Sequence, residues 1–127
     1  MGFLFLRQGI VLANRMLGRK TMGVPEIQAE ELKQRLDAGE SLYLLDVRDE
    51  NEFETSNIGG HLIPLAELPE RVGELDSTCE IIAICKMGPR GAKAVMFLRK
   101  AGFTKVRNLA GGIHAWSDRV DHRVRKY

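Results

Sequence analysis

Cys85 is the residue of this sequence with the clearest capacity for chemistry. It follows Ile81-Ile82-Ala83-Ile84, an apolar run typical of a buried strand, and a short loop separates it from a helical pattern. A strand, a tight loop and a helix start gather unpaired peptide N–H groups around one point, which makes an anion site. Those amides favour a thiolate at Cys85, and so do the charges of Lys86 and Arg90. The pattern therefore predicts a nucleophilic cysteine in the loop Cys85-Lys86-Met87-Gly88-Pro89-Arg90-Gly91, with Gly88 at a positive φ so that the loop can curl.

The length of this loop separates two kinds of thiolate chemistry. The spacing from Cys85 to Arg90 is Cys-x4-Arg, whereas tyrosine-type phosphatases and one class of arsenate reductase have Cys-x5-Arg. One residue fewer leaves a narrower cradle, which fits one additional sulfur atom better than a tetrahedral phosphate. A phosphatase or arsenate reductase is therefore the less favoured alternative.

Helical and strand patterns alternate along the chain and predict how this loop is positioned. Helices are expected over residues 29–37 and 92–101, around Trp116, and over 65–75 with an interruption at Pro69. Strands are expected over 42–46, 62–63, 81–84 and 105–109. Residues 49–57 are expected to be irregular, and a helical turn within them stays open. The alternation predicts an α/β fold of three layers, in which a mostly parallel sheet of about five strands is flanked by helices. In such folds the site lies beyond the carboxyl ends of the strands, where Asp46 and Cys85 both stand. We expect Asp46 and Arg48 to support the loop through hydrogen bonds.

Length and composition predict one globular domain with two appendages. The chain has 127 residues, of which 44% are hydrophobic and 28% charged, which excludes collagen-like, coiled-coil and wholly disordered classes. We divide it into a basic amphipathic extension over 1–23, a domain over 24–121 and a loose basic tail over 122–127. Contact of the extension with a membrane stays open.

Charge is distributed unevenly along the chain. Residues 26–80 carry 15 acids and 4 bases, whereas residues 81–127 carry 11 bases and 2 acids. If the last third builds the site, it offers a positive field to an anion. If the fold interleaves the two halves, the field is diluted, and the sequence leaves both possibilities open.

Four segments in order resemble the rhodanese family of sulfurtransferases over residues 24–121. They are Leu45-Asp46-Val47-Arg48, the region from Glu52-Phe53 to Ile63-Pro64-Leu65, the loop from Cys85 to Arg90, and Gly111-Gly112-Ile113-His114-Ala115-Trp116. The resemblance is closest to rhodanese domains fused to the adenylyltransferases that activate sulfur-carrier proteins, which share the Ile-Pro-Leu and Ala-Trp-x-x-x-Val-Asp runs. It implies the rhodanese-like form of the three-layer fold. The sequence departs from the family pattern at three points: Gly91 replaces a common Ser or Thr, Pro89 removes one loop N–H, and Asn57 replaces a common His.

The resemblance implies sulfur transfer through a persulfide on Cys85. The donor would be thiosulfate or a similar sulfane-sulfur compound, held by Lys86 and Arg90, and the acceptor a thiol or a protein. No metal or organic cofactor is implied. A low-turnover persulfide carrier, acting as a binding module for a partner protein, is the main alternative.

The remaining reactive residues are interpreted as bystanders. Cys79 and Cys85 are about 20 Å apart along an extended strand, too far for a disulfide. Free thiols fit a reducing compartment, and a cytoplasmic location is expected. His61, His114 and His122 lack metal-ligand spacing, although a pairing of Cys85 with His61 or His114 stays open. Trp116 is expected in the core, and the basic tail lacks the interleaved aromatic residues of a nucleic-acid site, so no nucleic-acid partner is expected.

Overall fold

A single sheet of five parallel strands forms the centre of the molecule. The computed structural model describes residues 23–127, so the predicted extension lies outside the described residues except for its last position. The strands are β1 Glu26–Ile27, β2 Leu42–Asp46, β3 His61–Leu62, β4 Glu80–Ile84 and β5 Val106–Leu109. Their order is β1-β5-β4-β2-β3. Asp46 of β2 pairs with Ile84 of β4, so the carboxyl ends of these neighbouring strands lie side by side.

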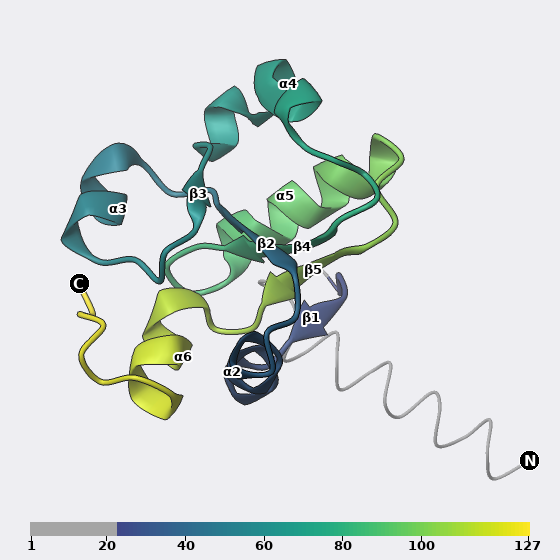
Figure 1. Cartoon of the computed structure of the whole chain (residues 1–127). Helices are drawn as coiled ribbons and strands as arrows, with labels where there is room; N and C mark the ends of the chain where they lie inside the picture. Colours follow the sequence, from purple (N-terminus) through teal and green to yellow (C-terminus); the bar gives the residue numbers. More distant parts are fainter. Residues whose placement is uncertain (1–22) are drawn as a thin grey trace, which may run out of the picture.

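Helices cover both faces of this sheet, as predicted for an α/β fold of three layers (Figure 1). They are α2 Ala29–Asp37, α3 Glu50–Thr55, α4 Leu68–Arg71, α5 Pro89–Lys100 and α6 Gly112–Arg119, with short 3-10 turns η2 Leu65–Glu67 and η3 Val72–Glu74 on either side of α4. Helices α2 and α6 lie together on one face, and α4 and α5 lie on the other (Figure 1).

The side chains of β4 show why the sheet needs two covered faces. Ile81 and Ala83 point into the core beneath α5, whereas Ile82 and Ile84 point into the core beneath α2 and α6. Alternate residues of a strand face opposite sides, so an unbroken apolar run is stable only between two apolar layers. Trp116 lies in the second core and is 6% exposed, as predicted for a core residue.

Two segments differ from the sequence-based expectation. The segment 49–57, expected to be irregular with a helical turn left open, contains the regular helix α3, because Asp49 and Glu52 form a reciprocal capping box at its start. The helix predicted over 65–75 is divided into η2, α4 and η3. Pro69, which cannot donate a backbone hydrogen bond, stands in the first turn of α4.

The tail over 122–127 also differs from the prediction that it is loose. Tyr127 is only partly exposed, and its hydroxyl is hydrogen-bonded to Arg48 and Glu52. Figure 1 shows this end of the chain returning past α6 towards α3. The helices of residues 23–127 include none that is both long and apolar enough to cross a membrane.

Candidate active site

Cys85 stands directly after β4, at the carboxyl edge of the sheet. The residue is 1% exposed, and its Sγ lies 3.0 Å from the backbone N of Gly88, which donates a hydrogen bond to it. Gly88 has a φ of 128°, as the sequence predicts, and immediately precedes α5. This curl turns the loop back over the sulfur, and the hydrogen bond places positive peptide charge against it.

Helix α6 holds the first half of the loop from outside. The backbone N of Ile113 donates to the carbonyl of Cys85 at 2.9 Å, and that of His114 donates to the carbonyl of Lys86 at 3.1 Å. A trans peptide directs its C=O and N–H to opposite sides, so the N–H groups of Lys86 and Met87 point away from α6. The hydrogen bonds from α6 to the two carbonyls thus fix the direction in which the N–H groups of Lys86 and Met87 point.

Gly112 makes this close approach of α6 feasible. Its φ is 60°, and a Cβ added there would lie 2.3 Å from the carbonyl oxygen of Cys85. A side chain at this position would push α6 away from the loop. Contact with the loop therefore explains the second glycine of the Gly-Gly pair, whereas a Cβ on the first, Gly111, would lie 2.6 Å from the Cβ of Ala115 within α6.

Asn108 of β5 holds the second half of the loop. Its Nδ2 donates to the carbonyl of Gly88 at 2.9 Å, and the residue is fully buried. Its Oδ1 lies where a side chain at position 91 would begin, 2.1 Å from an ideal Cβ on Gly91. Gly91, which departs from the family pattern, thus leaves the space that the Asn108 amide occupies.

Asp46 and Arg48 form a buried ion pair beside the loop. The carboxylate of Asp46 accepts from Arg48 Nε at 2.8 Å and from its Nη2 at 2.6 Å, and Nη2 also donates to the carbonyl of Ser56 at 2.6 Å. The following residue, Val47, donates its backbone N–H to Ile84 just before Cys85. The hydrogen bonds of Arg48 thus run to Asp46, to the carbonyls of Glu52 and Ser56 and to Tyr127 rather than to the loop, and the pair is linked to the loop only through the pairing of β2 with β4.

Arg90 lies in the first turn of α5 and is paired with Glu52 of α3. Its two terminal nitrogens contact the two carboxylate oxygens at 2.6 and 2.7 Å. These hydrogen bonds are the main reason why the pKa of Glu52 is lowered to about 2. The two oppositely charged halves of the sequence are interleaved at this point, which neutralises one of the loop cations.

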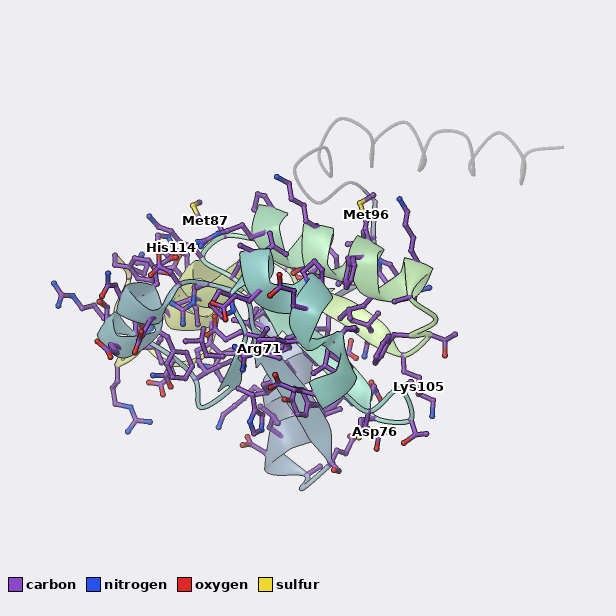
Figure 2. The ribbon with its side chains drawn as sticks, turned by 90° about the horizontal axis from the view of Figure 1, so that it is seen from above. Arg71, Asp76, Met87, Met96, Lys105 and His114 are labelled. Carbon is purple, nitrogen blue, oxygen red and sulfur yellow. The ribbon has the colours of Figure 1, made fainter. Side chains whose placement is uncertain are left out.

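The remaining loop residues differ in exposure. Met87 is 57% exposed at the outer side of the loop, and Pro89 occupies the first position of α5, where a missing N–H costs no helical hydrogen bond. Figure 2 shows Met87 and His114 near one another at the end of the molecule opposite Asp76 and Lys105. Met87 and His114 also line a groove of about 320 Å³ beside the loop.

The side chains of His61 and His114 contact aromatic residues, and the second cysteine is unpaired. Cys79 and Cys85 are both free thiols. His61 stacks on Tyr43, and His114 contacts Tyr127. Within residues 23–127, no group of three or more His, Cys, Asp or Glu side chains is arranged to hold a metal ion.

Three residues of the site were not identified as functional from the sequence: Glu52, Asn108 and Tyr127. Asn108 could have been found from the sequence, because it is a polar residue in a strand expected to be buried, and a buried polar side chain needs a hydrogen-bond partner. In the sequence, Glu52 stands out only as part of a segment that resembles the rhodanese family. Tyr127 was visible only as a lone aromatic residue in a basic tail.

Comparison with known proteins identifies the class. The family model described as a rhodanese-like domain matches residues 28–119. "Putative sulfur carrier protein YrkF" of Bacillus subtilis is 37% identical over 118 residues, which cover 92% of this chain and 62% of that protein. "Probable adenylyltransferase/sulfurtransferase MoeZ" of Mycobacterium tuberculosis is 38% identical over 97 residues, which cover 74% of this chain and 25% of that protein.

A solved structure has the same fold. The rhodanese-like domain protein from Staphylococcus aureus superposes with a TM-score of 0.70 at 30% sequence identity, over 76% of this chain and 94% of that one. The chain belongs to the rhodanese-like family of sulfurtransferases and sulfur carriers. It spans about three-fifths of YrkF and a quarter of MoeZ.

Proposed function

We propose that this protein transfers sulfane sulfur through a persulfide on Cys85. The observation that carries the proposal is the hydrogen bond from the backbone N of Gly88 to Cys85 Sγ, at 3.0 Å. An amide aimed at sulfur stabilises a thiolate, and it can equally stabilise the terminal sulfur of a persulfide.

The reaction has two displacement steps and needs no external oxidant or reductant. The Cys85 thiolate attacks the outer sulfur of a donor such as thiosulfate, a new S–S bond forms, and the old S–S bond breaks as sulfite leaves with the bonding electrons. A thiolate or cyanide then attacks the outer sulfur of the persulfide, and the Cys85 thiolate is the leaving group. This is covalent catalysis by an activated nucleophile.

The test is the intact mass of the protein after incubation with thiosulfate. We expect the mass to rise by one sulfur atom, and the rise to disappear when a thiol acceptor is added. Cys85→Ser should abolish the gain, whereas Cys79→Ser, which changes the other thiol, should retain it. Equal sulfur uptake by the Cys85→Ser variant would contradict the proposal, and hydrolysis of an aryl phosphate without sulfur uptake would favour phosphatase chemistry.

A low-turnover persulfide carrier is the second candidate. It is favoured by the burial of Cys85, which is 1% exposed, and by the name of the relative YrkF. Full persulfide loading combined with negligible turnover to cyanide, but rapid transfer to a protein thiol, would distinguish this function from that of a general thiosulfate sulfurtransferase.

A further inference from the structure

Tyr127 is linked to both charged side chains of the loop. It contacts Lys86 directly, and it is connected to Arg90 by a hydrogen bond to Glu52. Its ring lies 5.0 Å from Lys86 Nζ, within the range of a cation–π contact. Its hydroxyl donates to Glu52 Oε2 at 2.8 Å, and Glu52 holds both terminal nitrogens of Arg90. The two side chains expected to receive an anionic donor are therefore already engaged within the protein.

A buried side chain, that of Arg48, holds the hydroxyl of Tyr127 in place. This hydroxyl accepts from Arg48 Nη1 at 2.8 Å, and Arg48 is itself fully buried and paired with Asp46. A hydroxyl that joins a buried guanidinium to a carboxylate fixes the position of that carboxylate. Glu52 is thus fixed both by Tyr127 and by the capping box at the start of α3.

The charges in this network are stable at neutral pH. The pKa of Glu52 is lowered to about 2, first by its hydrogen bonds with Arg90, so the carboxylate is ionised. The pKa of Tyr127 is raised to about 12, chiefly because burial disfavours the phenolate, so the hydroxyl keeps the proton that it donates.

We propose that Glu52 and Tyr127 form a latch that withholds Arg90 and Lys86 from small dianions, so that the protein prefers sulfur donors with less charge than thiosulfate. This inference rests on the proposed sulfur transfer. The favoured donors are organic persulfides and thiosulfonates, whose transferable sulfur reaches Cys85 without requiring a free guanidinium. A thiosulfate dianion has to compete with the Glu52 carboxylate for Arg90.

The first experiment compares two donors of similar size that differ by one charge. Thiosulfate is a dianion and methanethiosulfonate a monoanion, and each presents one transferable sulfur. Glu52→Gln should lower the KM for thiosulfate by about tenfold, equivalent to about 1.4 kcal/mol, and that for methanethiosulfonate by about threefold, since half the charge is attracted. Tyr127→Phe should give about a threefold decrease for thiosulfate, because the carboxylate stays but loses one anchor. The kcat values should change little.

The matched control is Arg125→Gln, which removes a charge from the same tail at an exposed position. It should leave the ratio of the two KM values unchanged. The latch is refuted if Glu52→Gln and Tyr127→Phe also leave that ratio unchanged while thermal unfolding shows both variants folded.

A second experiment does not require sulfur transfer. Sulfate is titrated into each protein, and its dissociation constant is read from the backbone amide resonance of Gly88. Glu52→Gln should bind sulfate about tenfold more tightly than the unchanged protein. If the unchanged protein takes sulfur from neither donor, the proposed function fails, and this titration still decides the latch: equal or undetectable sulfate binding in all variants overturns it.

Discussion

The contact between Asn108 and Gly91 predicts that Gly91→Ala destabilises the unchanged protein but stabilises a variant in which Asn108 has been replaced by alanine. An alanine Cβ at position 91 would lie 2.1 Å from Asn108 Oδ1, so the amide must rotate away. Rotation breaks the hydrogen bond from Asn108 Nδ2 to the carbonyl of Gly88, now 2.9 Å long. Without that contact, glycine to alanine in α5 would stabilise the helix by about 0.5–1 kcal/mol.

The cost of displacing Asn108 should exceed the gain in helix stability. The carbonyl of Gly88 keeps a second donor, the backbone N of Ala92, so loss of the Asn108 bond should cost only about 1 kcal/mol. Displacing a side chain in a filled core adds about 1–2 kcal/mol. After the helix gain is subtracted, we expect Gly91→Ala to destabilise the protein by about 1–2 kcal/mol.

The assay is urea unfolding of four proteins: the unchanged chain, Gly91→Ala, Asn108→Ala and the double variant. In the Asn108→Ala background the space is free, so Gly91→Ala should stabilise by about 0.5–1 kcal/mol. The interaction energy between the two sites should thus be about 2 kcal/mol. Additivity to within about 0.5 kcal/mol would refute the reasoning, because the two positions would then be independent. Asn108→Ala should also slow persulfide formation, since it releases Gly88.

Three further changes test other contacts of the site. Gly112→Ala should destabilise the protein by about 3 kcal/mol or more in urea unfolding, because the residue has a φ of 60° and its new Cβ would collide with the loop backbone. The control Gly73→Ala, whose Cβ would have no atom within 4 Å, should change the free energy of unfolding by less than about 0.5 kcal/mol. Arg48→Met should lower the free energy of unfolding by about 3–5 kcal/mol, since it leaves the Asp46 carboxylate buried and unpaired; a loss below about 1 kcal/mol in thermal unfolding would contradict this. The pKa of Glu52 is lowered by its pairing with Arg90, from an ordinary value of 4.5 to about 2, so its stabilisation is complete above pH 4.5 and is lost as the pH falls towards 2. Between pH 4.5 and 2, the free energy of unfolding of the unchanged protein should therefore fall by about 1–2 kcal/mol more than that of Glu52→Gln. This difference is smaller than the pKa shift alone would give, because the partner guanidinium is about one-third exposed and solvent screens the pair. Parallel acid-unfolding curves would contradict the prediction.

The central part of the fold follows from local patterns in the sequence. The run ending at Ile84 predicts β4, and the residues after Cys85 predict a curled loop before a helix, as found. Strand β1 was not predicted because its two residues include only one apolar side chain, whereas the equally short β3 overlaps the apolar pair Leu62-Ile63. For helix α3, the expectation from the sequence left open only a helical turn, although the capping box from Asp49 to Glu52 is a local signal for a regular helix.

The contacts that regulate charge at the site could not be read from local patterns. Arg90 and Glu52 are 38 residues apart, and Tyr127 and Glu52 are 75 apart. Their meeting depends on where α3 and the tail fold relative to the loop, which no periodicity encodes. Local patterns consequently predict the loop that carries Cys85, whereas the pairing of Arg90 with a carboxylate is foreseen only in the general possibility that the fold interleaves the two charged halves.

The shape and the charge of this loop depend on different parts of the chain. Its shape is fixed by neutral contacts, from α6 to the carbonyls of Cys85 and Lys86 and from Asn108 to that of Gly88. Its charge is set by Glu52 and Tyr127, which do not touch the loop backbone in any of these contacts. Substitutions in the first group should therefore act on stability and on persulfide formation with every donor, whereas substitutions in the second should act on the preference between donors. A protein with the same loop sequence but different residues at these two distant positions is expected to hold a persulfide equally well and to take its sulfur from a different source.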